Sequence, residues 1–374
     1  MKIVVTGLRG FPDVQGGVER HCEKLYTNLI RNGCEITVFT RRPYVNHEIQ
    51  DYKGINLIPI ECPKNKYLEA IVHTFRCVVK ARRLNPDILH IHAIGPSLFT
   101  PLARLLGMRV VMTHHGPDYK REKWPLPAKI FLRFCEMVGV RFANKVIAIA
   151  DNIAYELKDR YNVDAVVIPN GVDIPERVGT DDVLKRFGIE RDRYILAVGR
   201  FVPEKGFDYL IEAFNRLQSA SHMSHVKDWK LVIVGDADHE DRYSIKLKEK
   251  ARMGKDVILT GFQTGRSLAE LYSHARLFVL PSFYEGLPIA LLEAMSYGLS
   301  CIASDIPANR CIELEDDRFF KAGDTEAILE KIKGFINRPW NNADKKRQII
   351  RLSEKYNWER IAEKTIKIYS DILE

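Results

Sequence analysis

The amino-acid sequence predicts an α/β protein made of two doubly wound, Rossmann-like domains. Short runs rich in Val and Ile alternate with amphipathic stretches at helical spacing, which is typical of a parallel sheet flanked by helices. This pattern restarts in the second half of the chain. The length of 374 residues agrees with two domains, because a single domain usually has about 150 residues.

The individual elements follow in order along the chain. Strands of the first domain are expected at residues 2–6, 35–40, 88–91, 109–113, 146–149 and 165–168. A turn signal at residues 170–173 and a polar linker at residues 174–192 then separate the domains. Strands of the second domain are expected at residues 194–198, 229–234, 257–259, 277–280 and 300–303. We therefore expect domains at residues 1–175 and 176–355, and a C-terminal helix at residues 356–374 that returns to the first domain.

The composition, with 46% hydrophobic and 28% charged residues, excludes a disordered or fibrous chain. No apolar run of about 18 residues and no secretory leader is visible, which predicts a cytoplasmic protein. The seven cysteines are scattered without C-x-x-C spacing, so free thiols are expected. The net charge of +8 arises in residues 1–180, where 26 Lys and Arg accompany 18 Asp and Glu. This asymmetry favours an anionic partner such as nucleic acid, a phosphorylated substrate or a membrane surface.

Gly16 and Gly17 lie between the first strand and a helix whose core face includes Val18, Cys22 and Leu25. Glycines at such a point let backbone N–H groups approach a ligand closely, and the helix N-terminus favours an anion. The spacing does not fit the G-x-G-x-x-G dinucleotide fingerprint, and a plain glycine turn is the alternative.

Gly199, Arg200 and Lys205 follow the strand expected at residues 194–198. The carboxyl end of a parallel strand is where ligands bind in open α/β sheets. An Arg fork and a flexible Lys together suit a diphosphate. Two solvated surface cations are the alternative.

Glu285, Gly286, Leu287 and Glu293 follow the buried strand expected at residues 277–280. Pro288 suits the first turn of a helix, which places Glu285 on the loop and Glu293 more than a turn inside the helix. The two carboxylates are therefore expected to face different parts of one elongated ligand. Glu293 lies in an apolar string and needs a hydrogen-bonding ligand or partner. The alternative is a helix N-terminal Glu followed by a mid-helix Glu in solvent.

Four histidines, His90, His92, His114 and His115, fall at the ends of neighbouring predicted strands. No carboxylate or thiolate pattern completes a metal-ligand set around them. We therefore expect a polar binding wall and predict no metal site.

Together these segments resemble the retaining glycosyltransferases of family 4 over nearly the whole chain. The resemblance rests on the Gly16-Gly17 loop, the segment Thr113-His114-His115-Gly116, the turn Asn170-Gly171-Val172-Asp173, Gly199-Arg200 with Glu204-Lys205-Gly206, and the E-x7-E pair Glu285 and Glu293. It implies the GT-B fold, in which two Rossmann-like domains face each other across an interdomain cleft. The first domain would lie on the acceptor side and the second would bind the nucleotide sugar. Residues 115–124 look like a bacterial subgroup that builds capsule or O-antigen repeats, rhamnosyltransferases among them.

The resemblance also implies roles for single residues. Arg200 and Lys205 would bind the donor diphosphate, Glu285 would contact the sugar hydroxyls, and His114 would line the sugar pocket. The expected catalytic residues are thus His114, Arg200, Lys205 and Glu285. The expected substrate-binding residues are Gly16, Gly17, Gly199, Gly286, Leu287 and Glu293, of which Glu293 would hold the ribose and Gly17 would place a backbone N–H near the phosphates.

The expected function is that of a hexosyltransferase in bacterial polysaccharide biosynthesis. It would move a sugar from a UDP-, GDP- or dTDP-linked donor to a glycan or lipid-linked acceptor, with no metal and no cofactor besides the donor substrate. The candidate nucleophiles Asp13, Asp118 and Glu122 lie on loops, and the family implies a same-face mechanism without a protein nucleophile. Two alternatives stay open: a nucleotide-sugar 2-epimerase of the same fold, and a non-catalytic nucleotide-sugar or nucleic-acid binder. A nucleic-acid partner is not expected, because no stripe of interleaved aromatics and cations is visible.

Two basic amphipathic stretches, at residues 64–83 and 120–145, interleave Lys and Arg with large apolar residues. Such stretches lie in membrane interfaces, and each cation near an anionic leaflet adds about 1 kcal/mol. We therefore expect the N-terminal half to bind the inner face of the cell membrane peripherally. The alternative is that both stretches are ordinary helices whose apolar positions are buried in the core.

Overall fold

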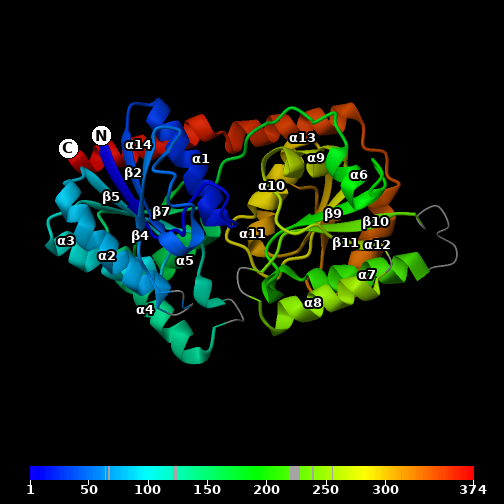
Figure 1. Ribbon diagram of the computed structural model, residues 1–374, viewed down its shortest axis with the longest axis horizontal. Coiled ribbons are helices and arrows are strands. Elements are labelled where there is room, and N and C mark those ends of the chain that lie inside the picture. The colour runs from blue at the N-terminus through cyan, green and yellow to red at the C-terminus, as the bar shows by residue number, and fades with distance from the viewer. Residues whose placement is uncertain are drawn as a thin grey trace. The chain divides into compact units, whose positions relative to one another are not determined.

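The computed structural model describes residues 1–63, 65, 68–120, 124–219, 228–237, 240–254, 256–312 and 314–374. These residues form two compact units, unit 1 with residues 1–171 and 356–374 and unit 2 with residues 172–355. Each unit contains one sheet of mainly parallel strands flanked by helices (Figure 1). The predicted fold class, α/β with two Rossmann-like doubly wound domains, is confirmed.

The sheet of unit 1 has the strand order β3-β4-β2-β1-β5-β6-β7-β8, and only the β3–β4 pair is antiparallel among the described strands. Its strands are β1 (Lys2–Thr6), β2 (Glu35–Arg41), β3 (Asp51–Tyr52), β4 (Ile55–Ile60), β5 (Ile88–His92), β6 (Val110–His114), β7 (Lys145–Ala148) and β8 (Val166–Val167). The sequence prediction missed β3 and β4. Asn56 and Pro59 interrupt the apolar run of β4, and Pro is uncommon inside a sheet because it cannot donate to the ladder. In the structure Pro59 lies opposite Thr40 of β2.

Helices cover both faces of this sheet. They are α1 (Gly17–Arg31), α2 (Glu69–Leu84), α3 (Thr100–Leu105), α4 (Leu126–Phe142), α5 (Asp151–Tyr161) and α14 (Trp358–Leu373), with short 3-10 helices η1 (Arg42–Tyr44), η2 (Pro96–Phe99) and η3 (Asp118–Lys120). Side chains alternate across a strand. Ile3 and Val5 of β1 therefore pack with α1 and α14, whereas Val4 packs with α2 and α3.

The C-terminal helix α14 belongs to unit 1 and packs against α1. Trp358 and Tyr369 of this helix join the core that contains Ile3. Gly171 lies against Trp358, because a Cβ added at Gly171 would come within 2.7 Å of Trp358 Cε2. The structure divides the chain directly after Gly171, slightly before the boundary expected at residue 175.

The sheet of unit 2 has the order β11-β10-β9-β12-β13-β14, with all described pairs parallel. Its strands are β9 (Tyr194–Val198), β10 (Lys230–Val234), β11 (Val257–Leu259), β12 (Leu277–Leu280), β13 (Ser300–Ser304) and β14 (Phe319–Phe320). Its helices are α6 (Asp182–Phe187), α7 (Phe207–Ser219), α8 (Arg242–Met253), α9 (Gly265–His274), α10 (Ile289–Ser296), α11 (Pro307–Arg310), α12 (Thr325–Ile336) and α13 (Asn342–Lys355), with 3-10 helices η4 (Pro203–Lys205) and η6 (Asp316–Arg318).

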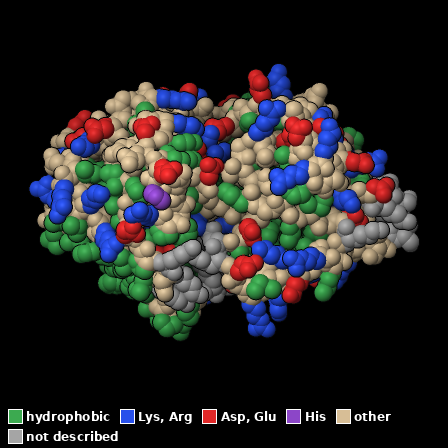
Figure 2. Space-filling model, in the orientation of Figure 1, with side chains coloured by type: hydrophobic (Ala, Val, Ile, Leu, Met, Phe, Trp, Pro, Cys, Tyr) green, Lys and Arg blue, Asp and Glu red, His purple; other side chains and the backbone are tan. Residues whose placement is uncertain are grey.

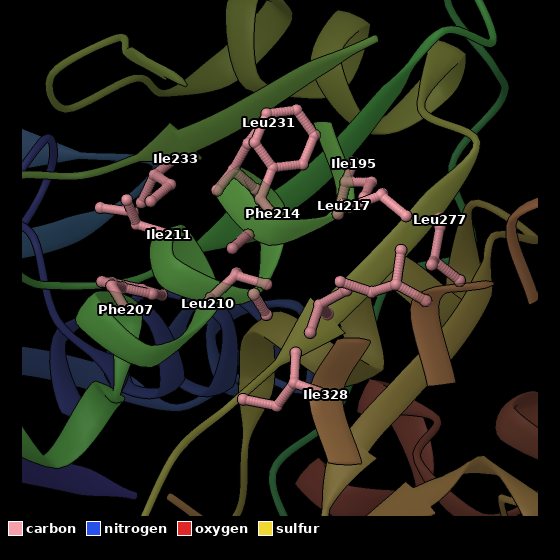
Figure 3. Packing of buried hydrophobic residues seen from close by; sticks show 14 of the residues in the cluster. Ile195, Phe207, Leu210, Ile211, Phe214, Leu217, Leu231, Ile233, Leu277 and Ile328 are labelled. Atoms are coloured by element: carbon pink, nitrogen blue, oxygen red, sulfur yellow. The ribbon is translucent and has the colours of Figure 1, made fainter. Parts of the chain in front are cut away.

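The core of unit 2 lies between its sheet and α7. Phe207 and Phe214 of α7 pack towards Ile195 of β9 and Leu231 of β10 in the buried cluster (Figure 3). Burying side chains of this size contributes about 1.5–3 kcal/mol each. This core fixes β9 and the loop that follows it. In the parts of the chain that the structure describes, no helix has both the length and the apolar character needed to cross a membrane.

Candidate active site

Two loops at the carboxyl ends of the neighbouring strands β9 and β12 touch in unit 2. The Phe283 N–H donates a hydrogen bond of 2.8 Å to the carbonyl oxygen of Glu204. Gly206, with φ 63°, lies against Pro281, and an added Cβ would overlap the Pro281 carbonyl oxygen. Glycine at position 206 therefore permits both the left-handed backbone and the close approach of the two loops.

The contact between these loops brings Lys205 and Glu285 together. Lys205 Nζ donates to Glu285 Oε1 at 2.6 Å, and the two side chains are only 16% and 11% exposed. Ser282 Oγ donates to the same carboxylate oxygen at 2.6 Å. The Lys205 stem lies beside Gly199, where an added Cβ would be 3.3 Å from Lys205 Cε. A cation and a carboxylate are thus held at the edge of the sheet where ligands bind in this fold class.

The other predicted residues of these loops differ in accessibility. Arg200 follows Gly199 directly and is partly exposed, as is Gly286. Leu287 is buried, with 6% exposure. Its side chain packs inwards, so only its backbone could contact a ligand.

Glu293 lies in α10 and is partly exposed. The Tyr272 hydroxyl of α9 donates to Glu293 Oε2 at 3.2 Å. The Tyr272 ring in turn stacks on Tyr297, with ring centroids 5.2 Å apart and planes at 15°. Tyr272 is therefore a hydrogen-bond partner of the Glu293 carboxylate that no sequence motif indicates.

In unit 1, the loop at Gly16 and Gly17 is closed by a buried ion pair that the sequence analysis missed. Glu19 Oε1 accepts hydrogen bonds of 3.2 Å from both the backbone N–H and the side-chain Nε of Arg9. Arg9 Nη2 also donates to the carbonyl oxygen of Gln15. Burial alone would raise the pKa of Glu19, but the Arg9 guanidinium lowers it below its usual value.

Replacing Gly16 with Ala is expected to destabilise unit 1 by about 1–3 kcal/mol, because a non-glycine residue is strained at φ 153°. The new Cβ would also overlap Glu19 Oε2 and lie 2.8 Å from Arg9 Nη2. Urea unfolding measures the loss. Gly179→Ala is the matched control, since no atom of the described residues lies within 4 Å of its added Cβ. Equal free energies of unfolding for the two variants would contradict the strain expected at position 16.

His114, which is expected to line the sugar pocket, is buried in the structure. Its ring is 1% exposed, and Nε2 is 2.8 Å from Glu136 Oε1 of α4. The Gly116 N–H donates to the other ring nitrogen, Nδ1, at 3.1 Å. Burial would raise the pKa of Glu136, but hydrogen bonds from His114, Tyr161 and Tyr119 lower it. His114 is thus a buried contact between β6 and α4, and its role as a sugar-lining residue stays a prediction.

His115, one residue further, is the partly exposed ring. Its Nε2 lies 2.9 Å from His92 Nδ1, and the rings of His90 and His92 stack with centroids 4.2 Å apart. Consecutive residues of a strand point to opposite faces, so the sequence could have separated His114 from His115. His21 of α1 joins this group, with its ring centroid 5.0 Å from that of His115.

Of the candidate nucleophiles of unit 1, Asp13 lies on a loop, as expected, and is exposed. Asp118 begins the 3-10 helix η3 and is partly exposed. Glu122 lies outside the described residues. No covalent role is assigned to any of them.

Two family models and several known proteins match this chain. The model of the family described as Glycosyltransferase Family 4 matches residues 15–176, and the model described as Glycosyl transferases group 1 matches residues 181–355. The UDP-Gal:alpha-D-GlcNAc-diphosphoundecaprenol alpha-1,3-galactosyltransferase of Escherichia coli is 28% identical over 284 residues, covering 73% of this chain and 69% of the relative.

Two solved structures share the fold at low sequence identity. The sucrose-phosphate synthase of Thermosynechococcus elongatus has a TM-score of 0.83 at 20% identity, covering 99% of this chain and 98% of that one. HepE from Anabaena, in complex with UDP-glucose, has a TM-score of 0.78 at 16% identity and covers 99% of each chain. The chain is therefore a glycosyltransferase with the GT-B fold, in which a segment that matches the Glycosyltransferase Family 4 model precedes one that matches the Glycosyl transferases group 1 model.

Proposed function

We propose that this enzyme moves a sugar from a nucleotide-sugar donor to a glycan or lipid-linked acceptor in bacterial polysaccharide biosynthesis, with retention of configuration and without a metal. The observation that carries the proposal is the Lys205–Glu285 pair in the segment that matches the group 1 model, on the loop that also contains Arg200. The names of the similar proteins support the substrate classes. The E. coli relative is named for UDP-galactose and a diphosphoundecaprenol-linked acceptor, and HepE holds UDP-glucose. O-antigen or capsule repeats are the proposed products, with rhamnose among the candidate sugars.

In the proposed mechanism, Arg200 and Lys205 stabilise the negative charge that develops on the departing diphosphate. Preorganised cations of this kind need no reorganisation at the moment of reaction. Glu285 holds the Lys205 ammonium in place and accepts hydrogen bonds from sugar hydroxyls. Glu293, oriented by Tyr272, holds the ribose.

The sugar-transfer step is proposed to proceed on one face of the sugar. The bond between C1 and the phosphate oxygen breaks, and the acceptor oxygen bonds to C1 on the same face. The acceptor proton passes to the departing phosphate oxygen. The bonds and the proton of this step are all accounted for without a protein base or nucleophile.

A thermal-shift panel on the full chain tests the donor site. UDP, GDP and dTDP are compared with UMP, GMP and dTMP, since a ligand that binds only the folded state stabilises it by mass action. One diphosphate should raise the thermal midpoint, and its monophosphate should do so much less, because the proposed cations bind the diphosphate. No shift with any diphosphate, or equal shifts with both members of a pair, would contradict the assignment.

Arg200→Ala and Glu293→Ala are each expected to weaken donor binding by about 1.5–3 kcal/mol, the value of one charge-assisted hydrogen bond. Arg200 would lose the contact with the phosphates and Glu293 the contact with the ribose. Calorimetric titration with the diphosphate found in the panel measures both losses. Unchanged affinity in two folded variants would remove these residues from the site.

Chelation is expected to leave sugar transfer intact, because Arg200 and Lys205 take the part that a divalent ion plays in metal-dependent transferases. The measurement compares initial rates in EDTA with rates after adding back Mg²⁺ or Mn²⁺. A loss of turnover in EDTA that either ion restores would overturn the metal-free mechanism.

We also propose that unit 1 attaches to the inner face of the membrane through α2, α3 and α4. The apolar side chains exposed on α4 are Leu126, Ile130, Phe131, Phe134, Met137 and Phe142, with exposures from 37% to 70%. Figure 2 shows hydrophobic side chains gathered over these three helices at its lower left. The alternative is that the apolar side chains of these helices are all buried in the core. It does not fit the exposure of the α4 side chains.

Cations accompany this apolar surface. Arg133 and Arg141 are exposed on α4, and Arg76 and Lys80 are exposed on α2 beside Phe75, which is 48% exposed. An apolar face bordered by Lys and Arg is typical of helices that lie in an anionic membrane interface. Six residues of the two basic stretches lie outside the described residues: Lys64, Lys66, Tyr67, Arg121, Glu122 and Lys123.

A further inference from the structure

Three histidines from different parts of unit 1 lie close together at the carboxyl ends of β5 and β6. They are His21 of α1, His92 at the end of β5 and His115 directly after β6. One nitrogen from each ring lies within 4.8 Å of a nitrogen from each of the others. We propose that His21, His92 and His115 bind one Zn²⁺ ion as a structural ligand of unit 1.

The ring positions fit a tetrahedral ion. Three imidazoles with Zn–N bonds of about 2.0–2.1 Å would place their nitrogens about 3.3 Å and their ring centroids about 5 Å apart. The observed centroid distances are 5.0 Å for His21–His115, 5.2 Å for His92–His115 and 5.8 Å for His21–His92. The nitrogens of His92 and His115 that face each other are 2.9 Å apart, so a small separation would admit the ion.

The three rings also lie in a largely buried setting. His92 is 0% exposed, and His115 is partly exposed. His21 is 2% exposed, and its ring forms a hydrogen bond with the Asn170 side chain.

A second layer of contacts orients His92. The Tyr26 hydroxyl is 2.5 Å from His92 Nε2 and 2.9 Å from His90 Nδ1. With Nε2 occupied by Tyr26, Nδ1 of His92 is left for the metal, as is usual for metal-bound histidines. His115 is partly exposed, which provides an entry path and room for water as the fourth ligand. A bound ion would tie α1 to β5 and β6.

The inference is independent of the proposed sugar transfer, because its test measures metal binding. The untagged full chain, stripped with EDTA and desalted, is titrated with ZnCl₂ by calorimetry, and CoCl₂ reports tetrahedral geometry by its visible absorption. We expect one ion per chain and a raised thermal midpoint on zinc addition. His115→Ala and His21→Ala should each weaken zinc binding more than tenfold, and Tyr26→Phe should weaken it about 10–100-fold.

His47→Ala is the matched control, because His47 is an exposed histidine of the same unit. Its zinc affinity should equal that of the unchanged chain. His115 is partly exposed, so His115→Ala keeps the test valid even where replacing the buried His21 impairs folding. The absence of saturable zinc binding, or equal affinity in His115→Ala and His47→Ala, would overturn the proposal.

Discussion

Replacing Lys205 with Met is expected to lower kcat/KM for sugar transfer by about 10²–10³-fold, because one preorganised charge at the departing diphosphate is lost. Met keeps an unbranched stem of the kind that lies beside Gly199, so the change removes the charge with little effect on packing. Glu285 retains the hydrogen bond from Ser282. Initial rates over a range of donor concentrations separate the loss in kcat from the change in KM.

Lys230→Met is the matched control for this prediction. Lys230 also forms an ion pair, with Nζ 2.5 Å from Asp256 Oδ1, and its side chain is 29% exposed. It stands at the amino end of β10, away from the edge of the sheet that carries Lys205. The control should keep full activity. Equal rates in the two variants would show that Lys205 has no special role.

The double substitution Phe131→Glu and Phe134→Glu is expected to abolish binding to anionic vesicles. Phe131 and Phe134 are 40% and 49% exposed, so each would bury about half a side chain in the interface, worth about 1 kcal/mol, and each added carboxylate would be repelled by the anionic surface. Together these losses amount to about a hundredfold to a thousandfold in affinity. Co-sedimentation of the full chain with vesicles of anionic and neutral lipid, at low and high salt, measures the effect.

Ile245→Glu in α8 of unit 2 is the control, because Ile245 is also an exposed apolar side chain, at 46% exposure. This variant should still bind anionic vesicles, and salt should weaken that binding as it weakens binding of the unchanged chain. Equal recovery of the unchanged chain with neutral and anionic vesicles would overturn the membrane proposal. If the double variant still binds anionic vesicles, the membrane contact does not depend on α4.

The fold was predictable where local pattern and burial agree. The continuous apolar run Ile3, Val4 and Val5 in β1 indicates a strand that is buried on both faces. The structure places Ile3 and Val5 in one core and Val4 in the core on the other side of the sheet. Strand β4 was missed because Pro59 argues against a strand, whereas here the neighbouring β2 supplies the pairing. Such pairing depends on residues distant in the sequence, so a local pattern does not contain it.

The candidate site was predictable only in its parts. The sequence placed Lys205 and Glu285 at the carboxyl ends of two strands, but their contact depends on β9 and β12 being neighbours in the sheet. The partners Tyr272 of Glu293 and Arg9 of Glu19 come from other elements and carry no motif. The contact between His114 and Glu136 likewise joins two elements that are distant in the sequence, so no local pattern indicates it.

The most direct test of the central claim is mass spectrometry of a lipid-linked acceptor after incubation with the full chain and a nucleotide-sugar donor. The donor carries the base identified by the thermal-shift panel, and a parallel reaction omits the acceptor. The account predicts an acceptor heavier by one sugar residue, in the same anomeric configuration as the donor by NMR, with no conversion of the donor when the acceptor is absent. Formation of an epimer from the donor alone, with the acceptor unchanged, would contradict it and identify an epimerase.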